Sequence, residues 1–532
     1  MTIGVTGHRQ IATECTEAIE AAVISLLDRV RKSAPDTPLL LLTALAEGAD
    51  RLVARLACER AGADLVVVLP RAADSYRDDF ATAESKKEFD RLLAAARLVI
   101  TCPLATSDPT VGYAWAGHFT ALHSHLLVAL WDGHESRGHG GTANVVHAKL
   151  EGRYPGWSDA EPLQYDEGGA VAHVVTTRTG EAPPDGAGQV RWLFPDAVTI
   201  GAQSGEHRHA AVLSALNTLN RLLRRDGRAR DAWSADPTAP TVNALKQAAD
   251  QFASRFQHRT HVAVRIMVLA TIVAAISSAV GATAVAMATV ATGFAVWIYT
   301  TLSRWQRLHT DLRGLAEAGR IQAAWIVSGL QLSVADHYHP TQAASVAWIR
   351  RAMRTAVLLD DVQKPREPLS PEQRRRHAEA GHAWIDEQVA YFIGKGGVVP
   401  RYRKQARHFA ILGFVCLGIG LLLLGGNTLL NATHVHLDLI DTAPLLQVGR
   451  IALAVTAGVQ AYQAFMSFGD LQRSFAVSAL LFRRARDEAR AAAADDQPRL
   501  FRLIVQLGQA ALVENVSWMI LRRQRSIKPP AA

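Results

Sequence analysis

Short, almost purely apolar runs alternate with helical patterns over the first 200 residues of the chain. The runs lack the apolar–polar alternation of a strand with one face in water, so they are typical of a parallel sheet covered on both faces. We therefore predict an α/β, Rossmann-like domain over residues 1–204. Its expected strands are residues 2–5, 39–43, 64–69, 98–101 and 126–131, with edge strands at 171–176 and 190–193.

Later runs are uncharged over lengths that suit a membrane. Residues 266–300 carry no charge, and two further uncharged runs cover 409–433 and 451–469. A helix needs about 20 residues to cross a bilayer, so the first run can hold two spans with Gly281 at the turn. The pattern predicts an all-α membrane region with two transmembrane hairpins. The expected spans are residues 262–280, 283–302, 409–430 and 451–469.

Arginines and lysines flank both hairpins, for example Arg255 and Arg259 before the first and Arg473 after the second. By the positive-inside rule, the protein is a multi-pass protein of the inner (cell) membrane with cytoplasmic N- and C-termini. Each hairpin follows a basic helix and precedes an amphipathic one, and Gln306-Arg307 and Gln472-Arg473 lie at similar distances beyond the spans. This layout resembles a tandem repeat. The predicted segments are a helical linker at 205–240, a first two-helix unit at 241–364, and a second unit with a helical tail at 365–532.

Net charge and cysteine content indicate which binding partners the sequence favours. The net charge is +8, and the basic residues cluster beside the apolar runs, which favours a lipid bilayer over nucleic acid. The four cysteines show no paired spacing, which fits a reducing cytosol and supplies no metal motif. No signal peptide is expected, because Met1 runs directly into a glycine turn. The loop group His434, His436, Asp438 and Asp441 is interpreted as a polar loop outside the membrane.

Three glycine turns lie where predicted strands end and helices begin, which is where parallel sheets bind their ligands. They are Gly4-Val5-Thr6-Gly7-His8-Arg9, Glu47-Gly48-Ala49-Asp50, and Gly138-His139-Gly140-Gly141-Thr142 after Trp131-Asp132-Gly133. Glycines let the backbone approach an anion, and the first N–H groups of a helix can hold a phosphate. The candidate ligand-binding residues are Gly7, His8, Arg9, Glu47, Gly48, Asp50, Tyr113, His118, Asp132, Gly133, Gly140, Gly141 and Thr142.

Each candidate has an expected role and a structural alternative. His8 and Arg9 would clamp an anion, or form a solvated loop pair. Glu47 and Asp50 would accept ribose hydroxyls, although an acid in the first turn of a helix is also favoured by the helix dipole. Tyr113 and His118 would stack on a base or contact phosphate, or pack on the sheet. The glycines and Thr142 would otherwise serve as turn and capping residues.

The glycine turns, together with Val66-Val67-Val68-Leu69-Pro70, resemble the SLOG domain, a Rossmann-like fold shared with the DNA-processing protein A and Lonely Guy families. Residues 240–525 resemble SLATT domains, which are two-helix membrane effectors of bacterial conflict systems. The resemblance implies a homo-oligomeric antiphage-defence protein in which a nucleotide second messenger, of the cyclic-nucleotide or ADP-ribose type, triggers a pore-forming or membrane-perturbing effector. The SLOG-like domain of melastatin-type TRP channels has a similar sensor-and-pore organisation. No other cofactor is implied.

The sequence departs from the Lonely Guy motif at one position. Those enzymes carry a Glu shortly after their Gly-Gly-x-Gly-Thr loop, whereas Thr142 is followed here by Ala143, Asn144 and Val145. We therefore expect binding rather than cleavage and assign no catalytic residue. Two alternatives stay open. One is a membrane-tethered nucleotide hydrolase of the N-glycosidase or NAD-cleaving type, with Glu47, Asp50 or Asp132 as the substitute acid. The other is a single-stranded DNA-binding protein.

Overall fold

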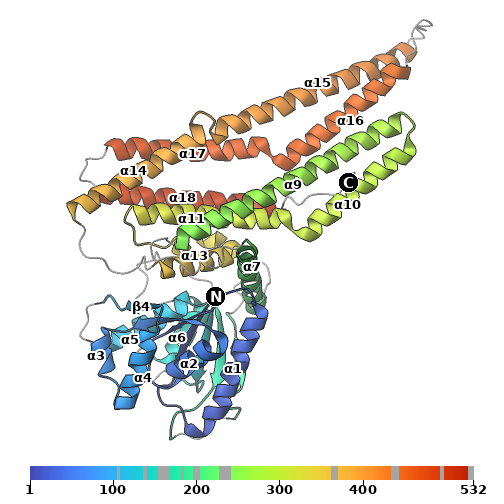
Figure 1. The fold of residues 1–532 in the computed structure, drawn as a ribbon. Coiled ribbons are helices and arrows are strands. Elements are labelled where there is room, and N and C mark those ends of the chain that lie inside the picture. The colour runs from blue at the N-terminus through green and yellow to red at the C-terminus, as the bar shows by residue number, and fades with distance from the viewer. Residues whose placement is uncertain are drawn as a thin grey trace. The chain divides into compact units, whose positions relative to one another are not determined.

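The computed structural model describes residues 1–104, 108–135, 140–153, 168–180, 185–195, 204–226, 241–360, 370–432, 443–491 and 497–524. These residues form two compact units (Figure 1). Unit 1 comprises residues 1–245 and 331–369, and unit 2 comprises residues 246–330 and 370–532. Unit 1 contains the sheet and unit 2 is helical, which confirms the predicted order of an α/β region followed by an all-α region.

Unit 1 is built on a seven-stranded sheet with the order β4-β3-β2-β1-β5-β6-β7. All neighbouring strands are parallel except β6 and β7, which are antiparallel. The strands are β1 (Thr2–Gly7), β2 (Leu40–Thr43), β3 (Asp64–Leu69), β4 (Leu98–Thr101), β5 (Leu126–Trp131), β6 (Ala170–Val175) and β7 (Val190–Leu193). Every predicted strand is present. However, β6 lies inside the sheet between β5 and β7, so of the two predicted edge strands only β7 lies at an edge.

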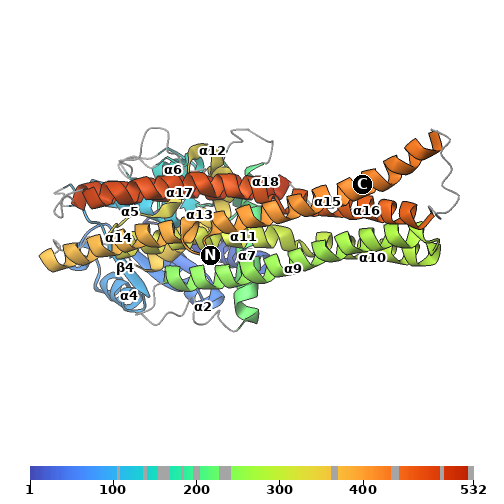
Figure 2. The same cartoon turned by 90° about the horizontal axis from the view of Figure 1, so that it is seen from above.

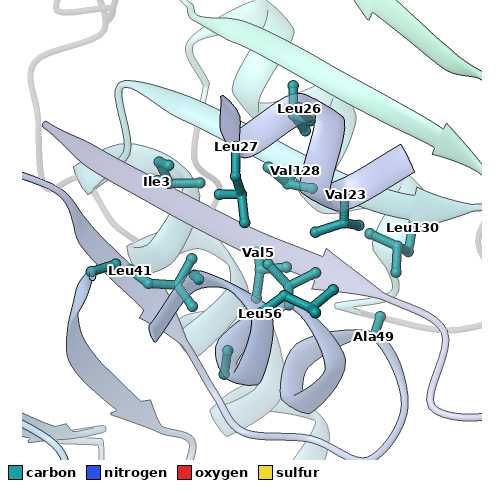
Figure 3. Packing of buried hydrophobic residues seen from close by; sticks show 14 of the residues in the cluster. Ile3, Val5, Val23, Leu26, Leu27, Leu41, Ala49, Leu56, Val128 and Leu130 are labelled. Atoms are coloured by element: carbon teal, nitrogen blue, oxygen red, sulfur yellow. The ribbon is translucent and has the colours of Figure 1, made fainter. Parts of the chain in front are cut away.

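Helices cover both faces of the sheet because its strands are apolar on both sides. One face packs on α1 (Thr16–Ser33), α2 (Ala49–Ala61) and α4 (Ala83–Ala94), and Figure 3 shows Val5 and Val128 of the sheet among side chains of α1 and α2. The other face packs on α5 (Pro109–His123) and α6 (Thr142–Glu151). The remaining short elements here are η1 (Thr13–Cys15) and α3 (Ala73–Arg77).

A segment from far along the chain completes unit 1. Residues 331–360, which the sequence assigned to the first membrane unit, form η2 (Val334–Asp336), α12 (Pro340–Ala343), η3 (Ala344–Val346) and α13 (Ala347–Leu359). Leu358 of α13 packs in the same core cluster as Trp115 of α5. The buried Arg354 donates to Asp336 at 2.5 Å, and Arg351 donates to the carbonyl of Gly168 at 2.7 Å. α13 also contacts α7 (Gly205–Arg225).

Unit 2 consists of long helices in two sets. The first set is α9 (Thr241–Ala279), whose first residues belong to unit 1, α10 (Thr283–Ser303) and α11 (Trp305–Val327). The second is α14 (Pro371–Ile393), α15 (Val398–Ala432), α16 (Ala443–Met466), α17 (Phe468–Ala491) and α18 (Gln497–Gln524). The hairpins α9–α10 and α15–α16 extend in one direction from a bundle of the other helices (Figures 1 and 2). Gly281, with φ +78°, forms the turn of the first hairpin.

Five helical stretches among the described residues are long and apolar enough to cross a membrane. They are Thr241–Ala279, Thr283–Ser303, Pro371–Leu429, Ala443–Ala491 and Gln497–Gln524. The four predicted spans fall in the first four stretches. The fifth, α18, belongs to the predicted cytosolic tail; it packs on α11, where Gly508 lies against the ring of Trp325. The predicted loop residues His434, His436, Asp438 and Asp441 lie outside the described residues.

The two sets of helices share an unusual joint. Arg304, between α10 and α11, has φ +52°, and Ser467, between α16 and α17, has φ +50°. An aromatic residue follows each joint, Trp305 and Phe468, and it contacts a tyrosine six positions earlier with ring centroids 5.2 Å and 6.2 Å apart. The two joints therefore share a left-handed backbone and an aromatic contact. Ser467 also ends the fourth predicted span two residues before its expected limit.

Substituting glycine at the second joint is expected to stabilise unit 2. A left-handed conformation costs a non-glycine residue roughly 1–2 kcal/mol, and Ser467→Gly removes this strain. We expect a gain of about 1 kcal/mol in the free energy of unfolding, measured by denaturant titration in detergent. The matched control is Ser517→Gly, in the middle of α18, which should lower stability by about 1 kcal/mol. Equal losses for both variants would contradict a strained joint.

Candidate functional site

The candidate site lies at the carboxyl ends of the central parallel strands. β1 pairs with β2 on one side and with β5 on the other, so the chain leaves β1 and β5 in opposite directions across the sheet. Such a switch point opens a crevice beyond the strand ends, where ligands of α/β sheets bind. The structure brings the loops after β1, β2 and β5 to this edge, as the sequence predicts.

His8 and Asp132 meet across the switch point. Nε2 of His8 accepts the backbone N–H of Asp132 at 3.1 Å and lies 3.2 Å from Oδ2 of the same residue. Both side chains are buried, at 4% and 7% exposure. Arg178, which follows β6, places Nε 3.7 Å from the same Oδ2. The residues that end β1, β5 and β6 thus form one polar cluster.

The environment of Asp132 favours its charged form. Burial alone would raise the pKa of Asp132, but a hydrogen bond from the N–H of His134 and the nearby His8 and Arg178 lower it below its ordinary value. The His134 N–H lies 2.9 Å from Oδ1. Asp132 is therefore an anion at neutral pH, with His8 and Arg178 beside its carboxylate.

Two of the predicted glycines are required by close packing. A Cβ on Gly7 would lie 2.4 Å from Cβ of Ala49 and 2.7 Å from the carbonyl oxygen of Leu130. Gly48 has φ +75°, and a Cβ there would meet the carbonyl oxygens of His8 and Arg9 at 2.6 Å and 2.4 Å. These glycines let β1 and the start of α2 approach each other. They shape the site whether or not their backbone touches a ligand.

The third glycine loop is described in part, because Gly138 and His139 lie outside the described residues. Gly133 has φ +88°, and Gly140 has φ +76° with its Cα packed on the backbone of Ala114 in α5. Gly141 is the N-cap of α6 and has no side-chain capping bond, and Thr142 is the first residue of the helix. The first turn of α6 contains no acid. The loop therefore presents a helix N-terminus toward the strand ends.

Glu47 and Asp50 turn away from each other. Oδ2 of Asp50 accepts hydrogen bonds from Oγ1 of Thr43 at 3.0 Å and from the N–H of Ala44 at 3.1 Å, so its carboxylate is used within its own loop. Glu47 instead accepts a hydrogen bond from the hydroxyl of Ser85 on α4. Of the two predicted ribose contacts, Glu47 lines the surface of the site and Asp50 is buried.

Removing the charge of Asp50 is expected to stabilise unit 1 in a pH-dependent way. Burial raises the pKa of Asp50 to about 6 from 3.8, so the folded state binds the Asp50 proton more tightly than the unfolded state does. The free energy of unfolding therefore falls as pH rises from 3.8 to about 6. Asp50→Asn keeps the acceptor for Thr43. It should match the wild type near pH 4 and exceed it at pH 7 by up to about 3 kcal/mol. Thermal unfolding against pH checks this, and a difference independent of pH would contradict it.

Tyr113 and Arg9 form the aromatic side of the site. The guanidinium of Arg9 lies over the Tyr113 ring, 5.0 Å from its centroid, and Arg71 lies 5.7 Å from it. The Tyr113 hydroxyl donates to Asp79, which also pairs with Arg71. His118 lies buried within α5, farther along the helix from Tyr113.

The sequence did not single out three residues that complete the site: Arg51, Ser85 and Arg178. Arg51 is 3% exposed; Nε donates to the carbonyl of Leu45 at 3.0 Å, and Nη1 donates to Oγ of Ser85 at 2.8 Å. The available signal for Arg51 was a charge on the apolar face of a helix. Beside it lies an open depression lined by Arg9, Gln10, Glu47, Gly48, Arg51, Glu84, Ser85, Lys87, Glu88 and Arg91.

The site thus joins glycine-lined backbone, two helix N-termini, an aromatic ring and several arginines at one sheet edge, an arrangement suited to a phosphorylated ligand with a ring. Comparison with known proteins does not narrow this further. No protein-family model matches the chain, and no curated protein matches it significantly.

Proposed function

We propose that the protein is a membrane-anchored sensor that binds a nucleotide-derived signal at the strand ends of unit 1 and controls an effector formed by unit 2. The observation that carries the proposal is the switch-point cluster of His8, Asp132 and Arg178, in a chain that also contains five apolar, membrane-length helical stretches. A polar site on one unit and an apolar bundle in the other favour signal reception coupled to the bilayer.

Three features support a nucleotide as the ligand. The N-termini of α2 and α6, next to Gly48 and Gly141, offer backbone N–H groups to phosphate. Arg9 and Arg178 can pair with phosphate oxygens. The ring of Tyr113 offers a stacking surface beside Arg9. Phosphate, ribose and base together correspond to the cyclic-nucleotide and ADP-ribose classes.

On this proposal the sensor resembles SLOG domains and the helical unit resembles SLATT effectors of bacterial antiphage defence. The protein would act as a homo-oligomer in the inner membrane, with both termini in the cytoplasm. Ligand binding would shift the equilibrium between two packings of the helices only by as much as the ligand prefers one of them. The result would be a membrane that becomes permeable when the signal is present.

Two measurements test the proposal separately. For the sensor, full-length protein in detergent is screened by thermal shift against ADP-ribose, NAD, cyclic AMP, cyclic GMP and cyclic dinucleotides. A ligand at 100 times its Kd should stabilise the protein by about 2.7 kcal/mol. For the effector, the protein is reconstituted into dye-loaded liposomes. Ligand-dependent release supports an effector, whereas intact liposomes with bound ligand would reject it.

The buried His8–Asp132 pair also supports a second candidate, a nucleotide hydrolase. A carboxylate 3.2 Å from an imidazole nitrogen is an arrangement used for general acid–base catalysis. Chromatography of NAD and nucleotide monophosphates incubated with the protein distinguishes the candidates. Base release that disappears in His8→Asn would favour the hydrolase, and unchanged nucleotide that still shifts the melting temperature would favour the sensor.

A further inference from the structure

Unit 2 encloses a cavity of about 360 Å³ to which both sets of helices contribute. Its lining runs from Thr260 and His261 of α9, next to the first predicted span, to Arg320 of α11. Residues of α14, α15, α17 and α18 close the other sides. This volume lies in the range of small-molecule sites in proteins. The cavity lies where the apolar hairpins meet the polar bundle.

Four charged side chains of the lining pair with one another, and a fifth donates to backbone carbonyl oxygens. Arg313 donates to Asp250 at 2.8 Å and also pairs with Glu317, which Arg320 contacts as well. Arg522 donates to the carbonyl oxygens of Phe465 and Met466 at 2.9 Å and 3.0 Å, at the end of α16. These arginines are therefore engaged by protein groups.

Two ionisable groups of the lining have no oppositely charged partner among the described residues. Glu514 of α18 accepts hydrogen bonds from Ser474 at 3.0 Å and Ser478 at 2.7 Å, and within the described residues no cation pairs with it. Arg401, at the start of α15, is exposed; it lies over the ring of Tyr402 at 5.6 Å and makes no ion pair with a described residue. Burial raises the pKa of Glu514, so its charged form gains most from a ligand that supplies a positive charge.

We infer that the cavity binds the headgroup of a zwitterionic phospholipid that carries a primary amine. The ammonium group would pair with Glu514, and the phosphate would pair with Arg401. A primary ammonium can donate N–H hydrogen bonds to the Glu514 carboxylate and to Asn515, which a trimethylammonium group cannot. An anionic headgroup such as phosphatidylglycerol would satisfy Arg401 alone and leave Glu514 unmatched. The inference requires a membrane but no nucleotide.

The test measures which lipids the full-length protein retains. The protein is purified from nanodiscs with equal amounts of phosphatidylethanolamine, phosphatidylcholine and phosphatidylglycerol with identical acyl chains, and bound lipid is counted by native mass spectrometry. We expect about tenfold enrichment of phosphatidylethanolamine over both others, equivalent to ~1.4 kcal/mol. Glu514→Gln, which can still bond both serines, should abolish the enrichment. Arg401→Gln should lower the retention of every phospholipid at this site.

The control is Glu387→Gln, an exposed acid of α14 outside the cavity lining, which should retain the wild-type preference. A preference for phosphatidylglycerol, equal retention of the choline and ethanolamine lipids, or an unchanged preference in Glu514→Gln would each overturn the inference. Thermal unfolding of each variant is measured in parallel. A loss of preference in Glu514→Gln supports the inference only when the variant unfolds at the wild-type temperature.

Discussion

Replacing Gly7 with alanine should strongly destabilise unit 1. The new Cβ would lie 2.4 Å from Cβ of Ala49 and 2.7 Å from the Leu130 carbonyl oxygen, so β1 would have to move away from α2 or β5. Overpacking of this kind costs about 3 kcal/mol. Hydrogen exchange of the β1 and β5 peptides measures the loss within unit 1, and these peptides should exchange faster by about two orders of magnitude.

The control for this substitution is Gly180→Ala. Gly180, unlike Gly7, has a positive φ, +85°, but nothing lies within 4 Å of an added Cβ. It should therefore show only the backbone strain of about 1 kcal/mol. If Gly7→Ala and Gly180→Ala had equal effects, close packing would not explain the glycine at the end of β1.

The second large effect is expected from Asp132→Asn. The variant removes the negative charge next to His8 and Arg178 but retains an oxygen that can accept the N–H of His134. Without that charge, Arg178 loses its ionic partner and His8 loses the neighbouring carboxylate at the strand ends. We expect affinity for the nucleotide that binds in the thermal-shift screen to fall at least about tenfold, or ~1.4 kcal/mol, by isothermal titration calorimetry.

The pH dependence of protein stability distinguishes a loss of nucleotide affinity in Asp132→Asn from a loss of folded protein. Because the folded state lowers the pKa of Asp132, its contribution to stability is present above the unfolded value of 3.8 and is lost as pH falls through the lower folded pKa. Asp132→Asn should thus be less stable than the wild type at pH 7 and converge with it in strong acid. Asp90→Asn, which removes an exposed partner of Arg77, is the control and should leave affinity unchanged. Full affinity in Asp132→Asn would contradict a role in the site.

The sequence predicts the strands of unit 1 well because their signal is local. Runs such as Leu126–Trp131 are apolar without interruption, and only a strand buried on both faces explains them at that length. Strand order is not local. The apolar run of β6 would suit an edge strand as well as an inner strand. Its position between β5 and β7 depends on pairing with residues of both neighbouring strands.

The candidate site could be predicted in outline and not in detail. The glycines of the site predict turns, and Asp132 follows the last residue of β5 next to one of these turns. Arg178 could not be found this way, because it reaches Asp132 only through the pairing of β6 with β5. Asp50 illustrates the opposite limit, since a carboxylate at a helix start looks the same in sequence whether it faces a ligand or its own loop.

In unit 2, the long uncharged runs predict the helices but not the residues at which the helices end. Neither Arg304 nor Ser467 is a residue type that favours a left-handed backbone, so the joints carry no sequence signal. α18 has the length and apolar composition of a span, although the sequence predicts it as part of a cytosolic tail. Its partners, including Asp311, which pairs with Arg523 at 2.6 Å, follow from tertiary packing.

The insertion of α13 into unit 1 has a consequence for synthesis of the chain on the ribosome. Leu358 belongs to the core beneath α5, yet it is translated after the whole α9–α10 hairpin. The core beneath α5 therefore cannot be completed until both helices of that hairpin have been translated. Completion of unit 1 thus depends on a segment that the ribosome makes only after the first two long apolar helices.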